Sequence, residues 1–133
     1  MIAKNFGLHL MLDFYGCEME PLASHSICYN ALSNLPAKMK MHKLIPPYVI
    51  WADSTEDRLG KDPGGYSGFV MIAESHISLH TFIKRGFISI DVYSCHNFNP
   101  EIPINYFKNI FKPKKIEKHL IIRGKNYPNK NIY

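Results

Sequence analysis

The stretch Gly68-Phe69-Val70-Met71-Ile72-Ala73-Glu74-Ser75-His76-Ile77-Ser78-Leu79-His80 decides the fold of this chain. It begins with an apolar run that is typical of a buried strand. The run leads directly into a carboxylate, two hydroxyls and two imidazoles within eight residues. We therefore expect a buried strand to deliver this polar cluster to the end of a sheet, where a rigid scaffold can position functional side chains.

The segment that follows has the alternation of a second central strand. Ile88, Ile90 and Val92 fall on every second residue and give that strand one apolar face. We expect two central strands, 68–74 and 86–93, on either side of an extended segment, 75–81, with a turn at 83–86.

The flanking segments add shorter elements. Pro21 can open a helix at its first turn and Pro36 should end it, because proline has no backbone N–H to donate. Pro46 and Pro47 remove sheet donors, so the strand around them should lie at an edge or begin only at Tyr48. The remaining predictions are a first strand at 8–15, a strand within 43–51, a surface loop at 52–65, a helix at 104–111 and a last strand at 118–123. Strands with two interspersed helices predict an α+β two-layer sandwich, in which a mainly antiparallel sheet carries its helices on one face.

Length and composition indicate one globular domain over residues 1–133. The chain is 46% hydrophobic, which is enough for a single core. It has no long apolar stretch and no secretory leader, so we expect a cytoplasmic protein without membrane segments. Its three cysteines, Cys17, Cys28 and Cys95, have neither an even count nor metal-type spacing, which favours reduced thiols.

The net charge of +5 is concentrated in the C-terminal part of the chain. Residues 108–133 contain eight basic residues and one acidic residue, whereas residues 1–107 contain eight basic and ten acidic ones. The basic tail, about 112–133, contains no recognised nucleic-acid-binding motif, so we do not expect nucleic acid as a partner. His25, His42, His96 and His119 show no paired metal-ligand spacing, so we assign no metal.

The polar cluster contains the groups that nucleophilic chemistry requires. Ser75 follows the carbonyl of Glu74, and His80 is a possible proton carrier five residues later. Cys95, at the end of the next strand, is a second potential acid or nucleophile. Spacing alone favours a structural interpretation, with polar residues on the wet face of a strand, a core histidine and a buried free cysteine.

Residues 65–81 and 86–95 together resemble the core signature of the prokaryotic S-adenosylmethionine decarboxylases. Residues 7–10 and 13–17 resemble the first strand and turn of that family, so the resemblance covers about two thirds of the chain. It implies the same two-layer α+β architecture and pairing of processed protomers into a homodimer.

The resemblance also implies a role for each matching residue. The chain would cleave itself between Glu74 and Ser75, giving a β chain of residues 1–74 and an α chain of residues 75–133. Ser75 would become a pyruvoyl group, with His80 and Ser67 assisting the cleavage. Cys95 would be the catalytic acid.

A pyruvoyl group supplies the electrophilic carbonyl that protein side chains lack. The substrate amine would form a Schiff base with it, and the electrons released with CO2 would be delocalised into the imine. The product expected from the resemblance is decarboxylated S-adenosylmethionine for polyamine (spermidine) biosynthesis.

Substrate recognition departs from the family pattern. Lys84 stands where many members carry a glutamate for the ribose hydroxyls, and an ammonium can only donate hydrogen bonds. Tyr48 and Trp51 are the aromatic side chains available to stack a purine, although both could be core residues.

Two alternatives remain open at this level. A relative acting on arginine or ornithine could use acidic residues of the loop, namely Asp53, Glu56 and Asp57. A non-cleaving regulatory partner is the other alternative, but such a protein has no physical need to retain all of Ser67, Glu74, Ser75, His80 and Cys95.

Overall fold

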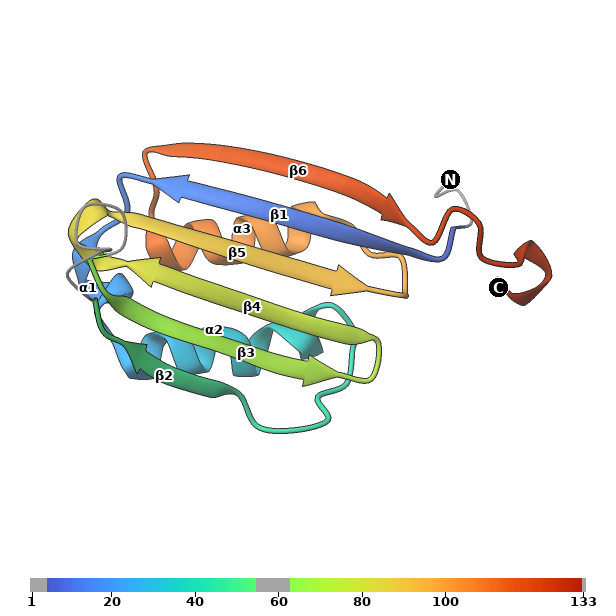
Figure 1. Cartoon of the computed structure of the whole chain (residues 1–133), viewed down its shortest axis with the longest axis horizontal. Coiled ribbons are helices and arrows are strands. Elements are labelled where there is room, and N and C mark those ends of the chain that lie inside the picture. The colour runs from blue at the N-terminus through green and yellow to red at the C-terminus, as the bar shows by residue number, and fades with distance from the viewer. Residues whose placement is uncertain (1–4, 55–62, 133) are drawn as a thin grey trace.

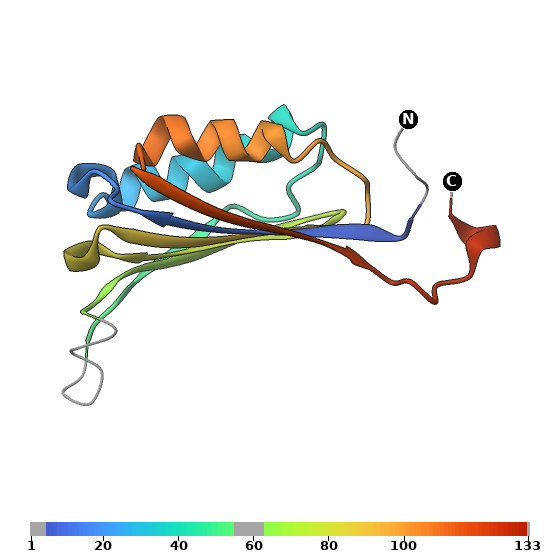
Figure 2. The same ribbon diagram turned by 90° about the horizontal axis from the view of Figure 1, so that it is seen from above.

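The computed structural model describes residues 5–54 and 63–132. Six strands form one sheet in the order β2-β3-β4-β5-β1-β6, with every neighbouring pair antiparallel. The helices lie on one face of this sheet, as Figure 2 shows in side view. The predicted α+β two-layer architecture is therefore confirmed. The elements are β1 Gly7–Tyr15, α1 Met19–Leu22, α2 His25–Lys38, β2 Tyr48–Ala52, β3 Gly65–Ile72, β4 Ser75–Phe82, β5 Phe87–Ser94, α3 Glu101–Phe111 and β6 Lys115–Arg123, with short 3-10 helices at Ile83–Arg85 and Asn129–Asn131.

Strand alternation divides the sheet into a covered face and an open face. In β4, Ile77 and Leu79 are fully buried under the helices, whereas His80 points to the other side and is exposed. The same alternation in β5 buries Ile88 and Ile90. We call the side of the sheet opposite the helices the open face; it is turned toward the viewer in Figure 1.

The core lies between the covered face and helices α2 and α3. Helix α2 contributes Leu32 and Leu35, and α3 contributes Phe107 and Phe111, all of them fully buried. The two helices are also joined by a hydrogen bond of 2.8 Å that the Tyr106 hydroxyl donates to a carbonyl of α2. One apolar stripe on each helix thus completes the core that the strands begin.

Several boundaries differ from those expected from sequence. The first helical region is two helices, because Ser24 caps α2 by accepting the Ile27 N–H at 3.1 Å. Pro36 lies inside α2 rather than beyond its end, and the helix stops two residues later. Strand β2 does begin at Tyr48 and lies at a sheet edge. Helix α3 and strand β6 each begin three residues earlier than predicted, at Glu101 and Lys115.

On the covered face, side chains from β2 and α2 approach the backbone of β3 closely at Gly68. A Cβ atom at this position would lie 2.8 Å from Val49 Cγ2 and 3.0 Å from Leu32 Cδ1. Helix α2 can therefore pack directly on β3 only because residue 68 has no side chain. Among the described residues, no helix has the length and apolarity needed to cross a membrane.

We expect Gly68→Ala to lower the free energy of unfolding by about 1–3 kcal/mol, because the added methyl group overpacks the contact between α2 and β3. Denaturant unfolding would measure this change. Asn105→Ala, on the exposed side of α3, is the control and should change stability by less than about 0.5 kcal/mol. Equal stability of the Gly68→Ala variant and the wild type would show that the helix can move away without cost.

Candidate active site at the hairpin between two central strands

The Glu74–Ser75 peptide bond lies at the tip of the β3–β4 hairpin. Ile72 and Ser75 form the last pair of the ladder, and only Ala73 and Glu74 connect them. Ser75 has a φ of +147°, a value that residues with a side chain rarely adopt. The backbone is therefore strained at the bond where sequence analysis predicts cleavage.

The carbonyl of Glu74 accepts a hydrogen bond from the next strand of the sheet. Cys95 follows the last residue of β5, and its backbone N–H donates to the Glu74 oxygen at 2.8 Å. An N–H aimed at a carbonyl oxygen stabilises the negative charge that forms there when a nucleophile attacks. The structure thus polarises this carbonyl and brings Cys95 next to residues 74 and 75.

The side chain of Glu74 is held on the other side of the hairpin tip by His42. Its Oε1 accepts the His42 backbone N–H at 3.1 Å, and its Oε2 lies 3.3 Å from His42 Nδ1. In addition, Ala73 N–H donates to the His42 carbonyl at 2.8 Å. Nothing in the sequence pattern pointed to His42, because this contact joins residues 32 positions apart.

These contacts also set the charge of the Glu74 carboxyl group. Burial raises its pKa, but hydrogen bonds from the backbone and ring of His42 and from its own backbone amide lower it more. The net pKa therefore lies below the ordinary value of 4.5. The hairpin tip is consequently held by a carboxylate at neutral pH.

Ser67 and His80 form a second cluster on the open face. Ser67 Oγ lies 2.9 Å from His80 Nδ1, across a directly opposed pair of β3 and β4. His80 lies five residues from Ser75 along one strand, which is about 16 Å at 3.3 Å per residue. Within one chain, the structure therefore does not bring Ser67 and His80 to Ser75 and Cys95.

The aromatic residues Tyr48 and Trp51 also do not form one site. Tyr48 lies on the open face, where it lines a hollow of about 190 Å³ together with Ser67 and His80. Trp51 is three residues further along β2, so it points to the other side and contacts Tyr66 at 5.2 Å between ring centroids. Only Tyr48 is thus placed beside predicted site residues.

The remaining candidates for substrate recognition are distributed as follows. Lys84 is exposed in the turn between β4 and β5, at the same end of the sheet as His80. Of the acidic loop residues, Glu56 and Asp57 lie outside the described residues. The described part of the chain contains no group of three or more His, Cys, Asp or Glu side chains arranged to hold a metal ion.

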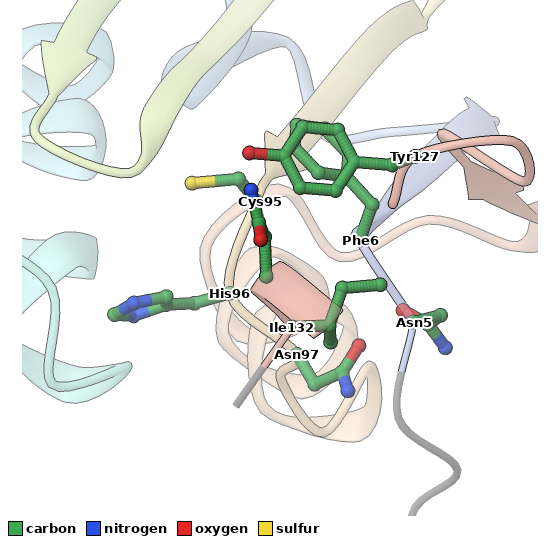
Figure 3. Close-up of a pocket in the computed structure, with 8 residues that line it drawn as sticks. Asn5, Phe6, Cys95, His96, Asn97, Tyr127 and Ile132 are labelled. Carbon is green, nitrogen blue, oxygen red and sulfur yellow. The ribbon is translucent and has the colours of Figure 1, made fainter. Parts of the chain in front are cut away.

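A cavity of about 560 Å³ opens beside Cys95 (Figure 3). The N-terminal segment, the residues that follow β5 and the C-terminal segment form its walls. Sequence analysis treated the C-terminal segment only as a basic tail and did not anticipate this wall. The lining residues are Asn5, Phe6, Cys95, His96, Asn97, Tyr127, Asn131 and Ile132.

We expect the stabilisation from the Glu74 carboxylate to disappear in acid. Since the folded state lowers this pKa, the contribution is present above the unfolded value of about 4.5 and is lost as pH falls through the lower folded value. In a Ser75→Ala background, Glu74→Gln should therefore reduce the melting temperature at pH 7, and this reduction should shrink as pH falls below 4.5 and through the lower folded pKa. Thermal melts across this pH range, with Glu101→Gln as an exposed control, would measure the difference. A pH-independent difference would contradict this assignment.

Comparison with known proteins gives the site its context. A family model described as S-adenosylmethionine decarboxylase matches residues 8–124. An S-adenosylmethionine decarboxylase proenzyme of Clostridium botulinum is 29% identical over 92% of this chain and 97% of its own, and one of Methanococcus vannielii is 31% identical over 91% and 92%. The crystal structure of the adenosylmethionine decarboxylase of Aquifex aeolicus superposes with a TM-score of 0.71 at 27% identity, covering 92% of this chain and 93% of that one. The chain therefore belongs to the S-adenosylmethionine decarboxylase family.

Proposed function

We propose that this protein is a proenzyme that converts its own Ser75 into a pyruvoyl group and then decarboxylates S-adenosylmethionine for polyamine (spermidine) biosynthesis. The observation that carries the proposal is the state of the Glu74–Ser75 bond. Its serine is backbone-strained, with φ +147°, and its carbonyl accepts the Cys95 N–H at 2.8 Å. This arrangement is suited to attack by a neighbouring hydroxyl.

Self-cleavage needs no reactant other than water. The Ser75 oxygen adds to the Glu74 carbonyl carbon and the amide C–N bond breaks, so that an ester replaces the peptide bond. Loss of the residue 75 Cα proton then expels Glu74 as a carboxylate. Water replaces the nitrogen of residue 75, which leaves as ammonia, and a ketone remains at the new N-terminus. The hydrogen bond from Cys95 N–H stabilises the oxygen of Glu74 during the first step.

The pyruvoyl group supplies an electron sink for the pair of electrons released with CO2. The protein itself must then deliver a proton to the substrate carbon. Cys95 is the candidate for this role, because its backbone is fixed beside residue 75 and its side chain borders the large cavity. No metal is required for this chemistry.

The composition of the cavity favours a nucleoside substrate over a basic amino acid. Among the described residues that line the cavity at Cys95, none is an aspartate or glutamate. A guanidinium or ammonium side chain buried there would lack a charged partner, which is costly. The aromatic rings and amide side chains present instead suit a flat, neutral base with hydrogen-bonding edges.

We propose further that two protomers share their active sites. Because His80 is about 16 Å from Ser75 along β4, and Ser67 lies opposite His80 on β3, neither can assist Ser75 within the same sheet. Stacked sheets lie about 10 Å apart. If a two-fold axis places the open faces together with their strands reversed, the His80 end of one chain covers the Ser75 end of the other.

The open face has the composition that such a contact requires. Its outward residues include exposed apolar side chains that no helix covers, among them Ile50, Phe69 and Met71. Tyr48 and Phe69 are stacked on this face at 6.1 Å between ring centroids. A large uncovered apolar patch is unusual on a monomer and is typical of an interaction surface.

The state of the cysteines is compatible with a cytoplasmic location, which we include in the proposal. Cys17, Cys28 and Cys95 are all free thiols. A reducing compartment keeps thiols in this form.

Ser75→Ala should abolish both cleavage and decarboxylation, because no hydroxyl is left to attack or to become the pyruvoyl group. Intact mass spectrometry of the denatured wild type should show residues 1–74 and a 75–133 fragment with a blocked, pyruvoyl N-terminus. Release of CO2 should occur with S-adenosylmethionine and not with arginine or ornithine. A wild-type chain that stays whole on incubation would overturn the proposed reaction, and CO2 from a basic amino acid alone would overturn the substrate.

Mixing two inactive variants tests the shared site. His80→Ala and Cys95→Ala should each reduce activity at least about 100-fold when alone. In a mixed dimer, one site combines Ser75 and Cys95 of the His80→Ala chain with Ser67 and His80 of the other chain. Random mixing should therefore restore about a quarter of wild-type activity. An inactive mixture in which mixed dimers are present would show that each site belongs to one chain.

A further inference from the structure

The C-terminal segment that follows β6 extends past the Cys95 end of the sheet, beside the N-terminal segment (Figures 1 and 2). Gly124 makes this path possible with a φ of +68°. A Cβ atom at residue 124 would lie 2.6 Å from the ring of Phe6, so a larger residue would displace the segment. Tyr127 N–H then donates to the Gly124 carbonyl at 2.9 Å and closes a turn.

This turn presents Tyr127 to the cavity. The Tyr127 ring packs against Phe6 with 4.6 Å between ring centroids, and Tyr127 remains 41% exposed. Figure 3 shows the two rings next to Cys95. Asn131 and Ile132, held by a short 3-10 helix, extend the same wall. Three of the residues that border the cavity thus come from residues 125–132.

We propose that residues 125–132 are a substrate-binding element of this enzyme, in which Tyr127 packs against the base of the nucleoside substrate and the Asn131 amide hydrogen-bonds its polar edge. The inference rests on the proposed function and adds residues that the family match, which ends at residue 124, does not include.

Size and chemistry support this assignment. A volume of about 560 Å³ lies within the range of pockets that enclose small ligands. A tyrosine ring that is already packed on Phe6 loses little conformational freedom when a base stacks on it. An amide side chain both donates and accepts, which matches the alternating donors and acceptors of a purine edge. Cys95, which lines the same cavity, is then positioned to reach the aliphatic part of the substrate.

The test compares Tyr127→Ala with Tyr127→Phe in the self-cleaved enzyme. Loss of the ring should raise KM for S-adenosylmethionine about 10-fold or more, whereas kcat and the cleaved fraction should change little. Tyr127→Phe retains the ring and should behave like the wild type, as should Lys108→Ala on the exposed side of α3, away from this segment. Calorimetry with methylthioadenosine, a nucleoside without a carboxylate to lose, should show the same weakening in Kd.

Unchanged KM and Kd in Tyr127→Ala would overturn the inference. If this variant does not fold, hydrogen–deuterium exchange on the wild type decides instead: methylthioadenosine should slow exchange in residues 125–132, and unchanged exchange at saturating nucleoside would overturn it. These outcomes are separate from failure of the proposed function. Suppose that the wild-type enzyme releases CO2 from S-adenosylmethionine but methylthioadenosine does not slow exchange in residues 125–132. This result would refute only the role of the C-terminal segment.

Discussion

The hydrogen bond from Cys95 N–H to the Glu74 carbonyl is the constraint on which the site depends. It joins the tip of the β3–β4 hairpin to the end of β5. The ladder between β4 and β5 ends at the pair Ser75 and Ser94, and this bond lies just beyond that pair. His42 holds the Glu74 side chain from the opposite side. Because both sides of the tip are fixed, the backbone of Ser75 is held at a strained φ of +147°. A residue keeps such a φ only where the contacts around it leave no other conformation.

The one-sided covering of the sheet explains where the other functional groups lie. Helices α2 and α3 bury every second residue of the central strands, so polar residues of the same strands must face the opposite side. Ser67 and His80 are placed together there by the register of β3 and β4. A straight strand keeps His80 distant from Ser75, and no rotation of side chains closes a gap of about 16 Å. The proposed contact with the sheet of a second protomer would bring the two clusters together.

The sequence predicted the features that have a short period and missed those that depend on long-range contact. Alternation placed the central strands and their buried faces, and tandem prolines correctly delayed β2 to Tyr48. The prediction that Pro36 ends the helix was wrong, because a proline in the last turn of a helix removes only one hydrogen bond near its end. Tyr48 and Trp51 lie on opposite faces of β2, because an odd spacing in a strand puts two side chains on opposite sides. His42 and Tyr127 reach the site only through the folded chain, so no local pattern could identify them.

In the proposed mechanism, the hydrogen bond from Cys95 N–H to Glu74 acts both before and after self-cleavage. Before cleavage, the Cys95 N–H polarises the Glu74 carbonyl, and the strain at Ser75 favours breaking the bond that enforces it. After cleavage, Glu74 ends in a carboxylate, which is a stronger acceptor than the amide carbonyl it replaces. We therefore expect the bond to persist, so that Glu74, at the end of one fragment, stays attached to Cys95 of the other once the chain is no longer continuous. In the proposed mechanism, Cys95, which would later deliver a proton, is thus held in place by the carboxylate that the cleavage creates.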